Sequence, residues 1–196
     1  MSIMTKIDNI ISIEQGCPYG TIKQTPNNYD IFKIVGNELL HNRLTKIKCF
    51  LKSNSIYGIQ FTYKNKIDTR ETIIEANSKE TNLIEQEMDI NDDEEIIDFN
   101  LWLDLDIKLT GFEIITNKGR KQKFGYENDD VLRNPVSGNM DKVILGFCCY
   151  ADDEEGVTAI SAYYLNKKER SFYHIIALYI YKNKYFQFLQ NKLLYK

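Results

Sequence analysis

The sequence predicts an all-β domain followed by one long helix. From about residue 44 to 165, short runs of alternating apolar and polar residues end in turn sequences. The clearest run is FNLWLDLDI, residues 99–107, in which the apolar side chains share one face of a strand. Residues 167–196 instead contain no glycine or proline and carry an aromatic residue or leucine every seven residues, as a helix does. Many short strands without intervening helices are typical of an antiparallel sandwich or barrel.

Three strand pairs along this region share one layout, which predicts a pseudo-threefold β architecture. Each pair has a second strand in which a small residue is followed by alternating apolar positions. These second strands are IYGIQFTY (56–63), LTGFEIIT (109–116) and VTAISAYY (157–164), and they follow LTKIKCFL, IIDFNLWL and KVILGFCCY. The small residues at nearly regular spacing are Gly58, Gly111 and Ala159.

Residues 1–35 are predicted to form an N-terminal arm outside the β-domain. Isoleucines at positions 3, 7, 10 and 11 are spaced for one face of a short helix, which Gly16 would end. The stretch TPNNYD, residues 25–30, has the composition of a turn.

Residues 166–196 are predicted to form a basic amphipathic helix that docks on a protein partner. This segment contains seven lysine or arginine residues and one acidic residue, Glu169. The net charge of the whole chain is only −3, so positive charge is concentrated in this segment and negative charge in the rest. Such a helix suits a partner with an acidic or mixed surface, and two alternatives are packing on its own domain or binding anionic lipid. The docking residues would be Phe172, Tyr179, Phe186, Leu189, Leu193, Lys182 and Lys184.

Composition indicates a globular intracellular chain, cytoplasmic or in a cytoskeletal assembly, and not a secreted one. Of 196 residues, 43% are hydrophobic and 27% charged, and the net charge of −3 predicts no general attraction to nucleic acid or membrane. We expect no signal peptide and no membrane span. No CxxC motif occurs, so we expect free thiols at Cys17, Cys49, Cys148 and Cys149.

The sequence predicts no enzyme, no cofactor and no metal site. The two histidines, His41 and His174, lie far apart in the sequence, and no recognised nucleophile, zinc or phosphate-loop motif is present. The run DINDDEE, residues 89–95, starts like a calcium loop but lacks its glycine and its final glutamate. The stretch TNKGRKQK, residues 116–123, could meet a phosphate, but an ordinary basic hairpin is favoured.

Several stretches together resemble the jacalin-related lectins. These are GFEIITNKGRKQKFG, EMDINDDEEII, IYGIQFTYKN, and VILGFCCY followed by TAISAYYL. The resemblance covers about residues 36–165 and implies a β-prism of three Greek-key antiparallel sheets around a pseudo-threefold axis. The expected chain is therefore an arm (1–35), a jacalin-like β-prism domain (36–165) and a C-terminal helix (166–196).

The same resemblance implies a carbohydrate site between a glycine-rich loop and the loop before the last strand. Thr158 stands where the family has an aspartate, one glycine remains of the glycine-rich element, and YADDEE is inserted. This degenerate loop favours a non-enzymatic interaction or structural module within a larger protein assembly. The alternative is a lectin for a mannose-type or other glycan, with the site residues Gly36, Tyr150, Glu155, Gly156, Val157 and Thr158.

Overall fold

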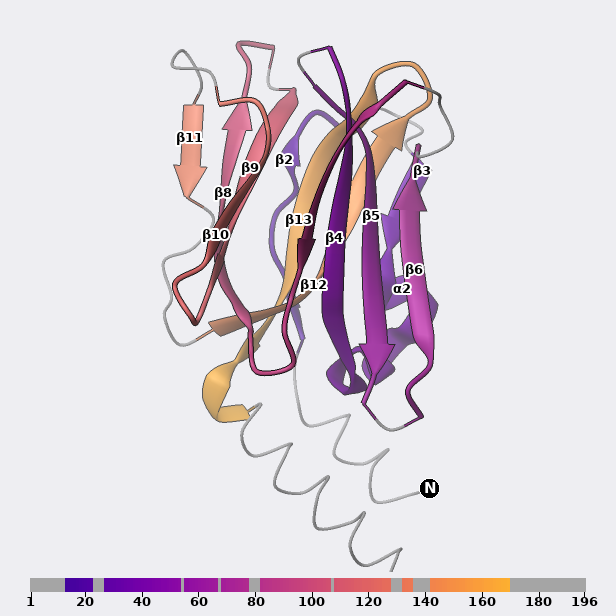
Figure 1. Ribbon diagram of the computed structural model, residues 1–196, viewed down its shortest axis with the longest axis vertical. Helices are drawn as coiled ribbons and strands as arrows, with labels where there is room; N and C mark the ends of the chain where they lie inside the picture. The colour runs from indigo at the N-terminus through magenta and orange to yellow at the C-terminus, as the bar shows by residue number, and fades with distance from the viewer. Residues whose placement is uncertain are drawn as a thin grey trace, which may run out of the picture.

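Three antiparallel sheets account for the strands of the computed structural model (Figure 1). The structure describes residues 13–22, 27–53, 55–66, 68–77, 82–106, 108–127, 132–135 and 142–169. Sheet B contains, in spatial order, β6 (Glu71–Ala76), β5 (Ser55–Asn65), β4 (Asn42–Lys52) and β7 (Ile84–Asp89). Sheet C contains β10 (Lys121–Gly125), β9 (Leu109–Thr116), β8 (Ile96–Leu103) and β11 (Leu132–Pro135). The predicted all-β class is thereby confirmed.

Sheet A joins the two ends of the described chain. Its spatial order is β1 (Glu14–Gln15), β13 (Gly156–Asn166), β12 (Lys142–Asp152) and β3 (Asn27–Asp30), and β2 (Tyr19–Gly20) also pairs with β13. Sheets B and C each follow the Greek-key order, in which the fourth strand returns beside the first. In sheet A the outer strands β1, β2 and β3 come from the N-terminal part of the chain and pair with β12 and β13 from its C-terminal part.

The N-terminal segment therefore differs from the predicted arm. Asn27 pairs with Ala151 and Asp30 pairs with Cys148, while Glu14 pairs with Tyr164. These strands are two to four residues long. Such short edge strands are fixed by hydrogen bonds to a partner strand, and they are too short to show a two-residue period of their own.

The pseudo-threefold repeat predicted from the sequence is present in the strand registers. In each central hairpin an aromatic residue stands opposite a small residue, and a β-bulge follows directly. A second register shift lies near the start of β4, β8 and β12. Small residues at these sites leave space for the neighbouring edge strand. The pairs are Phe50 with Gly58, Trp102 with Gly111, and Tyr150 with Ala159.

The core lies between the three sheets, and three phenylalanine rings, one from each sheet, meet at its centre. Phe61 of β5 and Phe147 of β12 stack with ring centroids 5.1 Å apart. Phe99 of β8 meets Phe147 edge-on at 5.4 Å, and all three side chains are fully buried. Aliphatic side chains from every sheet surround these rings. The core thus connects sheets A, B and C directly.

Short helical turns cover the lower end of sheet A in Figure 1. Helix α2 (Ile31–Val35) begins where the Asp30 carboxylate accepts a hydrogen bond from the Phe32 amide at 2.9 Å. The Tyr163 hydroxyl donates to the same carboxylate at 2.7 Å, and its ring stacks on Phe32. The 3₁₀ helix η1 (Gly36–His41) follows and leads into β4.

The described residues agree with the predicted free thiols, because all four cysteines are unbridged. Burial raises the pKa of the Cys49 thiol well above its usual value. The described residues contain no helix long and apolar enough to cross a membrane. Of the predicted C-terminal helix, residues 167–169 form one helical turn after β13, and the rest lies outside the described residues.

Candidate functional site

The tip between β12 and β13 is a tight turn with an internal cap. The Asp152 carboxylate accepts hydrogen bonds from the backbone amides of Glu154 and Glu155 at 2.9 and 3.1 Å. Gly156 begins β13 with a φ of 87°, a conformation that favours glycine. The Asp152 side chain therefore fixes the turn, and the side chains of Asp153, Glu154 and Glu155 are exposed at its tip.

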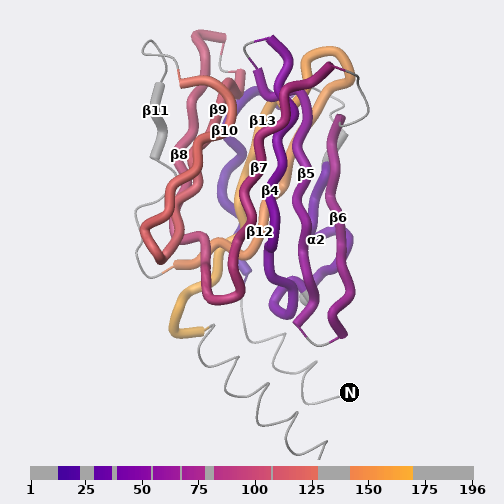
Figure 2. The backbone as a smooth tube through the Cα atoms, viewed as in Figure 1, coloured from indigo at the N-terminus to yellow at the C-terminus, as the bar shows by residue number. Residues whose placement is uncertain are grey.

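Sheet B packs against one side of this tip. The Tyr57 hydroxyl donates to the Asp153 carbonyl at 2.9 Å, and the Asn77 amide donates to the Asp152 carbonyl at 2.6 Å. A Cβ atom on Gly156 would lie 2.6 Å from the Tyr57 Cα, so this side of the tip has no room for a side chain. Figure 2 shows β4 and β5 rising beside β12 and β13 toward this end.

Two tyrosines and two lysines lie near the acidic tip. Burial and the nearby Asp153 carboxylate raise the pKa of Tyr29. The Lys52 ammonium lies 4.8 Å from the Tyr57 ring centroid, and on the sheet C side the Lys108 ammonium lies 3.9 Å from Glu155. The tip thus presents exposed carboxylates with tyrosine and lysine side chains nearby.

The predicted loop residues share this hairpin, but few of them face solvent. Thr158 and Val157 are buried, and the Thr158 hydroxyl donates to the Tyr150 carbonyl at 3.3 Å. The Thr158 hydroxyl is therefore engaged inside the hairpin and is not exposed at the tip. Glu155 alone among them extends an exposed side chain at the tip, while Tyr150 is half-buried on β12.

Gly36 lies at the opposite end of the prism and does not join the site. Strand β3 runs away from the tip, because Asn27 pairs with Ala151 near the tip and the chain then passes through α2 before Gly36. Figure 1 shows α2 at the lower end and the β12–β13 tip at the upper end. The N-terminal segment that does reach the tip follows β2, where the Thr21 amide donates to the Thr158 carbonyl at 3.1 Å.

Sequence reasoning missed the contribution of Tyr57, Asn77 and the segment after Gly20. Both side chains come from a different sheet and lie far from the tip in sequence, so no local motif identifies them. Gly20 carries a signal in retrospect. Its φ is 116°, and a Cβ atom there would lie 2.2 Å from the Thr158 carbonyl oxygen.

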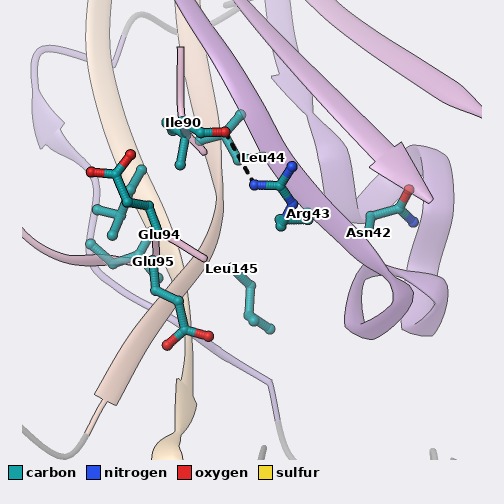
Figure 3. A pocket seen from close by; sticks show the side chains of 9 residues that line it. Asn42, Arg43, Leu44, Ile90, Glu94, Glu95 and Leu145 are labelled. Atoms are coloured by element: carbon teal, nitrogen blue, oxygen red, sulfur yellow. Dashed lines mark hydrogen bonds between the residues drawn. The ribbon is translucent and has the colours of Figure 1, made fainter. Parts of the chain in front are cut away.

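A hollow at the other end of the prism is built from paired charges. It lies between β4, β12 and the β7–β8 connection, and Figure 3 shows Glu94 and Glu95 pointing in opposite directions beside it. The Arg43 guanidinium reaches the carbonyls of Ile90 and Asn91 at 3.1 and 2.5 Å and pairs with Asp92. Arg43 therefore stabilises the connection and is not presented to a ligand.

The TNKGR turn meets the acidic connection 89–95 in the same region. The buried Glu94 carboxylate accepts from the Thr116 hydroxyl at 3.0 Å and from Arg120 at 2.5 Å. Lys118 pairs with Asp93 at 2.9 Å. Two of the cations considered for phosphate binding thus pair with carboxylates of the connection, in keeping with an ordinary hairpin.

Other predicted features are not represented at the site. The docking residues Phe172, Tyr179, Phe186, Leu189, Leu193, Lys182 and Lys184 lie outside the described residues. Over the ranges that the structure describes, no group of histidine, cysteine, aspartate or glutamate side chains is arranged to hold a metal ion.

Solved structures with the same fold are lectins. The agglutinin of Calystegia sepium aligns with a TM-score of 0.60 at 16% identity, over 80% of this chain and 98% of its own. A mannose-binding jacalin-related lectin from Ananas comosus aligns with 0.56 at 19% identity, over 79% and 98%. Artocarpin in complex with methyl-α-mannose aligns with 0.57 at 13% identity, over 78% and 97%. At these identities the likeness shows the fold.

The sequence itself matches none of the curated proteins with which it was compared. A family model described as a Jacalin-like lectin domain matches residues 17–163, which include strand β2 of the predicted N-terminal arm. This family consists of non-enzymatic lectin domains, in agreement with the prediction that the chain is not an enzyme. Since the match covers well over half of the residues, this chain belongs to the family of jacalin-like lectin domains.

Proposed function

We propose that this chain binds a neutral, mannose-type glycan at the β12–β13 tip. The observation that carries the proposal is the set of exposed carboxylates of residues 153–155 on a capped, rigid turn at the end of the central hairpin of sheet A. Membership of a lectin family supports it, and mannose is named for two proteins with the same fold. The glycan function, which was the alternative in the sequence analysis, is therefore preferred over a purely structural module.

The chemistry of the tip favours a ligand that donates hydrogen bonds. Ionised carboxylates accept bonds from sugar hydroxyls, and such charge-assisted bonds are short and strong. The Glu154 and Glu155 amides already donate to Asp152, so the tip offers acceptors in place of free backbone donors. The same negative charge disfavours glycans that carry sialic acid or sulfate.

Removing the charge of the tip should abolish most of the binding. The variant Asp153→Asn/Glu154→Gln/Glu155→Gln keeps the volume of each side chain, and we expect at least about tenfold weaker binding of methyl-α-mannoside because charge-assisted bonds contribute roughly 1.5–3 kcal/mol. Isothermal titration calorimetry measures the change. The control Glu71→Gln removes an exposed charge from the start of β6, where Glu71 pairs with Lys64 at the end remote from the tip, and this variant should bind as the unmodified protein does.

A glycan array extends this test to ligand class. We expect signals from oligomannose glycans and weaker signals from their sialylated or sulfated counterparts. The proposal fails if the unmodified protein binds no neutral mannoside at millimolar concentration, or if the charge-removed variant binds as tightly as the control.

A second candidate function rests on the basic segment 166–196. Its segregated charge and its apolar stripe favour a protein-docking role. Deleting residues 170–196 should abolish cross-linking to a protein partner while the affinity for mannoside stays unchanged, because β13 runs from the tip at Gly156 to its remote end at Asn166. Retention of the same partner after the deletion would contradict the docking role.

A further inference from the structure

The three central hairpins provide an internal comparison for the residues that contact the tip. Each hairpin has one bulged residue directly before its small residue, and these bulged residues occupy equivalent places in sheets B, C and A. They are Tyr57, Thr110 and Thr158. Departures from the symmetry at these places show where the chain has acquired a separate role.

Two of the bulged residues serve their own hairpin. The Thr110 hydroxyl donates to the Trp102 carbonyl at 3.1 Å, and the Thr158 hydroxyl donates to the Tyr150 carbonyl at 3.3 Å. Tyr57 instead donates to Asp153, a residue of a different sheet. In sheet B, tyrosine in place of threonine therefore forms a hydrogen bond to the candidate ligand loop, where the two threonines bond within their own hairpins.

A second set of equivalent positions also differs in sheet B, where the residue again contacts the candidate ligand loop. The residue facing the small residue of each hairpin has a positive φ: 116° at Gly20, 78° at Gly125 and 48° at Asn77. Glycine adopts this conformation without strain, whereas asparagine adopts it at some cost. The Asn77 side chain reaches the Asp152 carbonyl, which explains the choice of asparagine over glycine.

We propose that Tyr57 and Asn77 are positioning residues, which hold the 152–156 loop in its ligand-binding conformation from the neighbouring sheet. The Asn77 side chain donates a hydrogen bond to the Asp152 carbonyl, and the Tyr57 hydroxyl donates one to the Asp153 carbonyl. The carboxylates of residues 153–155 remain exposed. The internal cap by Asp152 shapes the turn, and the two bonds from sheet B fix the turn relative to the prism. The role in ligand binding rests on the proposed glycan function, whereas the restraint of the loop does not.

Hydrogen exchange tests the restraint without any ligand. Tyr57→Phe removes the hydroxyl and keeps the ring near Lys52, and Asn77→Gly removes the amide and suits the positive φ. Each variant should speed exchange of the Glu154 and Glu155 amides about fivefold, as expected for the loss of one side-chain hydrogen bond, and the double variant should speed it further. The control Thr45→Val removes a comparable bond to the Thr62 carbonyl at the other end of the prism and should leave these amides unchanged.

Titration with methyl-α-mannoside on the same variants tests the role in binding. We expect about 25-fold weaker binding by the double variant, for two lost bonds of about fivefold each, and unchanged binding by Thr45→Val. Unchanged exchange in the double variant would overturn the restraint. Faster exchange with undiminished binding would overturn the positioning role. If the unmodified protein binds no mannoside but exchange is faster in the variants, the glycan function fails and the restraint of the loop is supported.

Discussion

Replacing Phe147 with alanine should destabilise the protein by about 4 kcal/mol, the cost expected for truncating a fully buried phenylalanine. The ring of Phe147 touches Phe61 and Phe99, so the substitution empties the place where the three sheets meet. A loss of this size is a large fraction of the stability of an ordinary domain. Urea unfolding followed by the fluorescence of the single tryptophan, Trp102, measures it, because Trp102 is buried in sheet C.

Two further variants make this result specific to the core. Phe147→Leu fills most of the volume and should cost roughly 1.5 kcal/mol or less. Ile73→Ala removes a side chain that is 52% exposed on β6, and it should change the stability by about 0.5 kcal/mol or less. If Phe147→Ala unfolds at nearly the same urea concentration as Ile73→Ala, the three rings do not form the common core.

The central hairpins could be predicted from the sequence because they carry long two-residue patterns. Strands β4, β5 and β13 have eleven residues each, so the alternation is repeated several times, and β12 is an apolar run of the same length. The pattern also misled at one end. FNLWLDLDI reads as a single strand, but β8 ends at Leu103, and Asp104 forms a turn with Lys108. Leu105, predicted to lie on the apolar face, is 88% exposed.

The candidate site could be predicted only as far as its hairpin. Residues 150–158 are local in sequence, and their turn follows from the glycine at 156. The contact from Tyr57 to Asp153 spans 96 residues, and it follows from the packing of one sheet on another. The family resemblance predicts Thr158 as a ligand contact from its place in the sequence, which leaves open on which of two strand faces its side chain lies. The β-bulge decides between them, and its position depends on hydrogen bonds to the partner strand.

The Glu94→Gln variant should lose about 2 kcal/mol of stability at neutral pH, since it removes the charge from a buried carboxylate that holds two loops together. The Glu94 side chain is 1% exposed and accepts bonds from the Asn91 amide, the Thr116 hydroxyl and Arg120. Beside it, the Asn117 backbone amide donates to the Glu95 carbonyl, and the Glu95 backbone amide donates to the Asn117 side-chain oxygen. The TNKGR turn is therefore joined to the β7–β8 connection through the buried Glu94 carboxylate and through the two bonds of Asn117.

The pH dependence of this loss separates charge from shape. Burial raises the pKa of Glu94, but the hydrogen bonds from Asn91 and Thr116 and the charge of Arg120 outweigh burial and hold the pKa below its ordinary value of 4.5. A carboxyl group with a lowered folded pKa stabilises the protein above its unfolded pKa, and this stabilisation is lost as the pH falls through the folded pKa. The difference between the unmodified protein and Glu94→Gln should thus be complete above about pH 5.5 and shrink toward zero in stronger acid.

Asp93→Asn provides the matched control, because Asp93 is on the same connection and pairs with Lys118 at the surface. Solvent screens such an exposed pair. We therefore expect the urea midpoint of Asp93→Asn to equal that of the unmodified protein at both pH 3 and pH 7. Glu94→Gln with the same deficit at pH 3 and pH 7 would show that shape, and not charge, is what the glutamate contributes. A deficit that disappears in acid for Glu94→Gln, with none for Asp93→Asn, would show that the charge of the buried Glu94 carboxylate helps to hold the TNKGR turn against the β7–β8 connection.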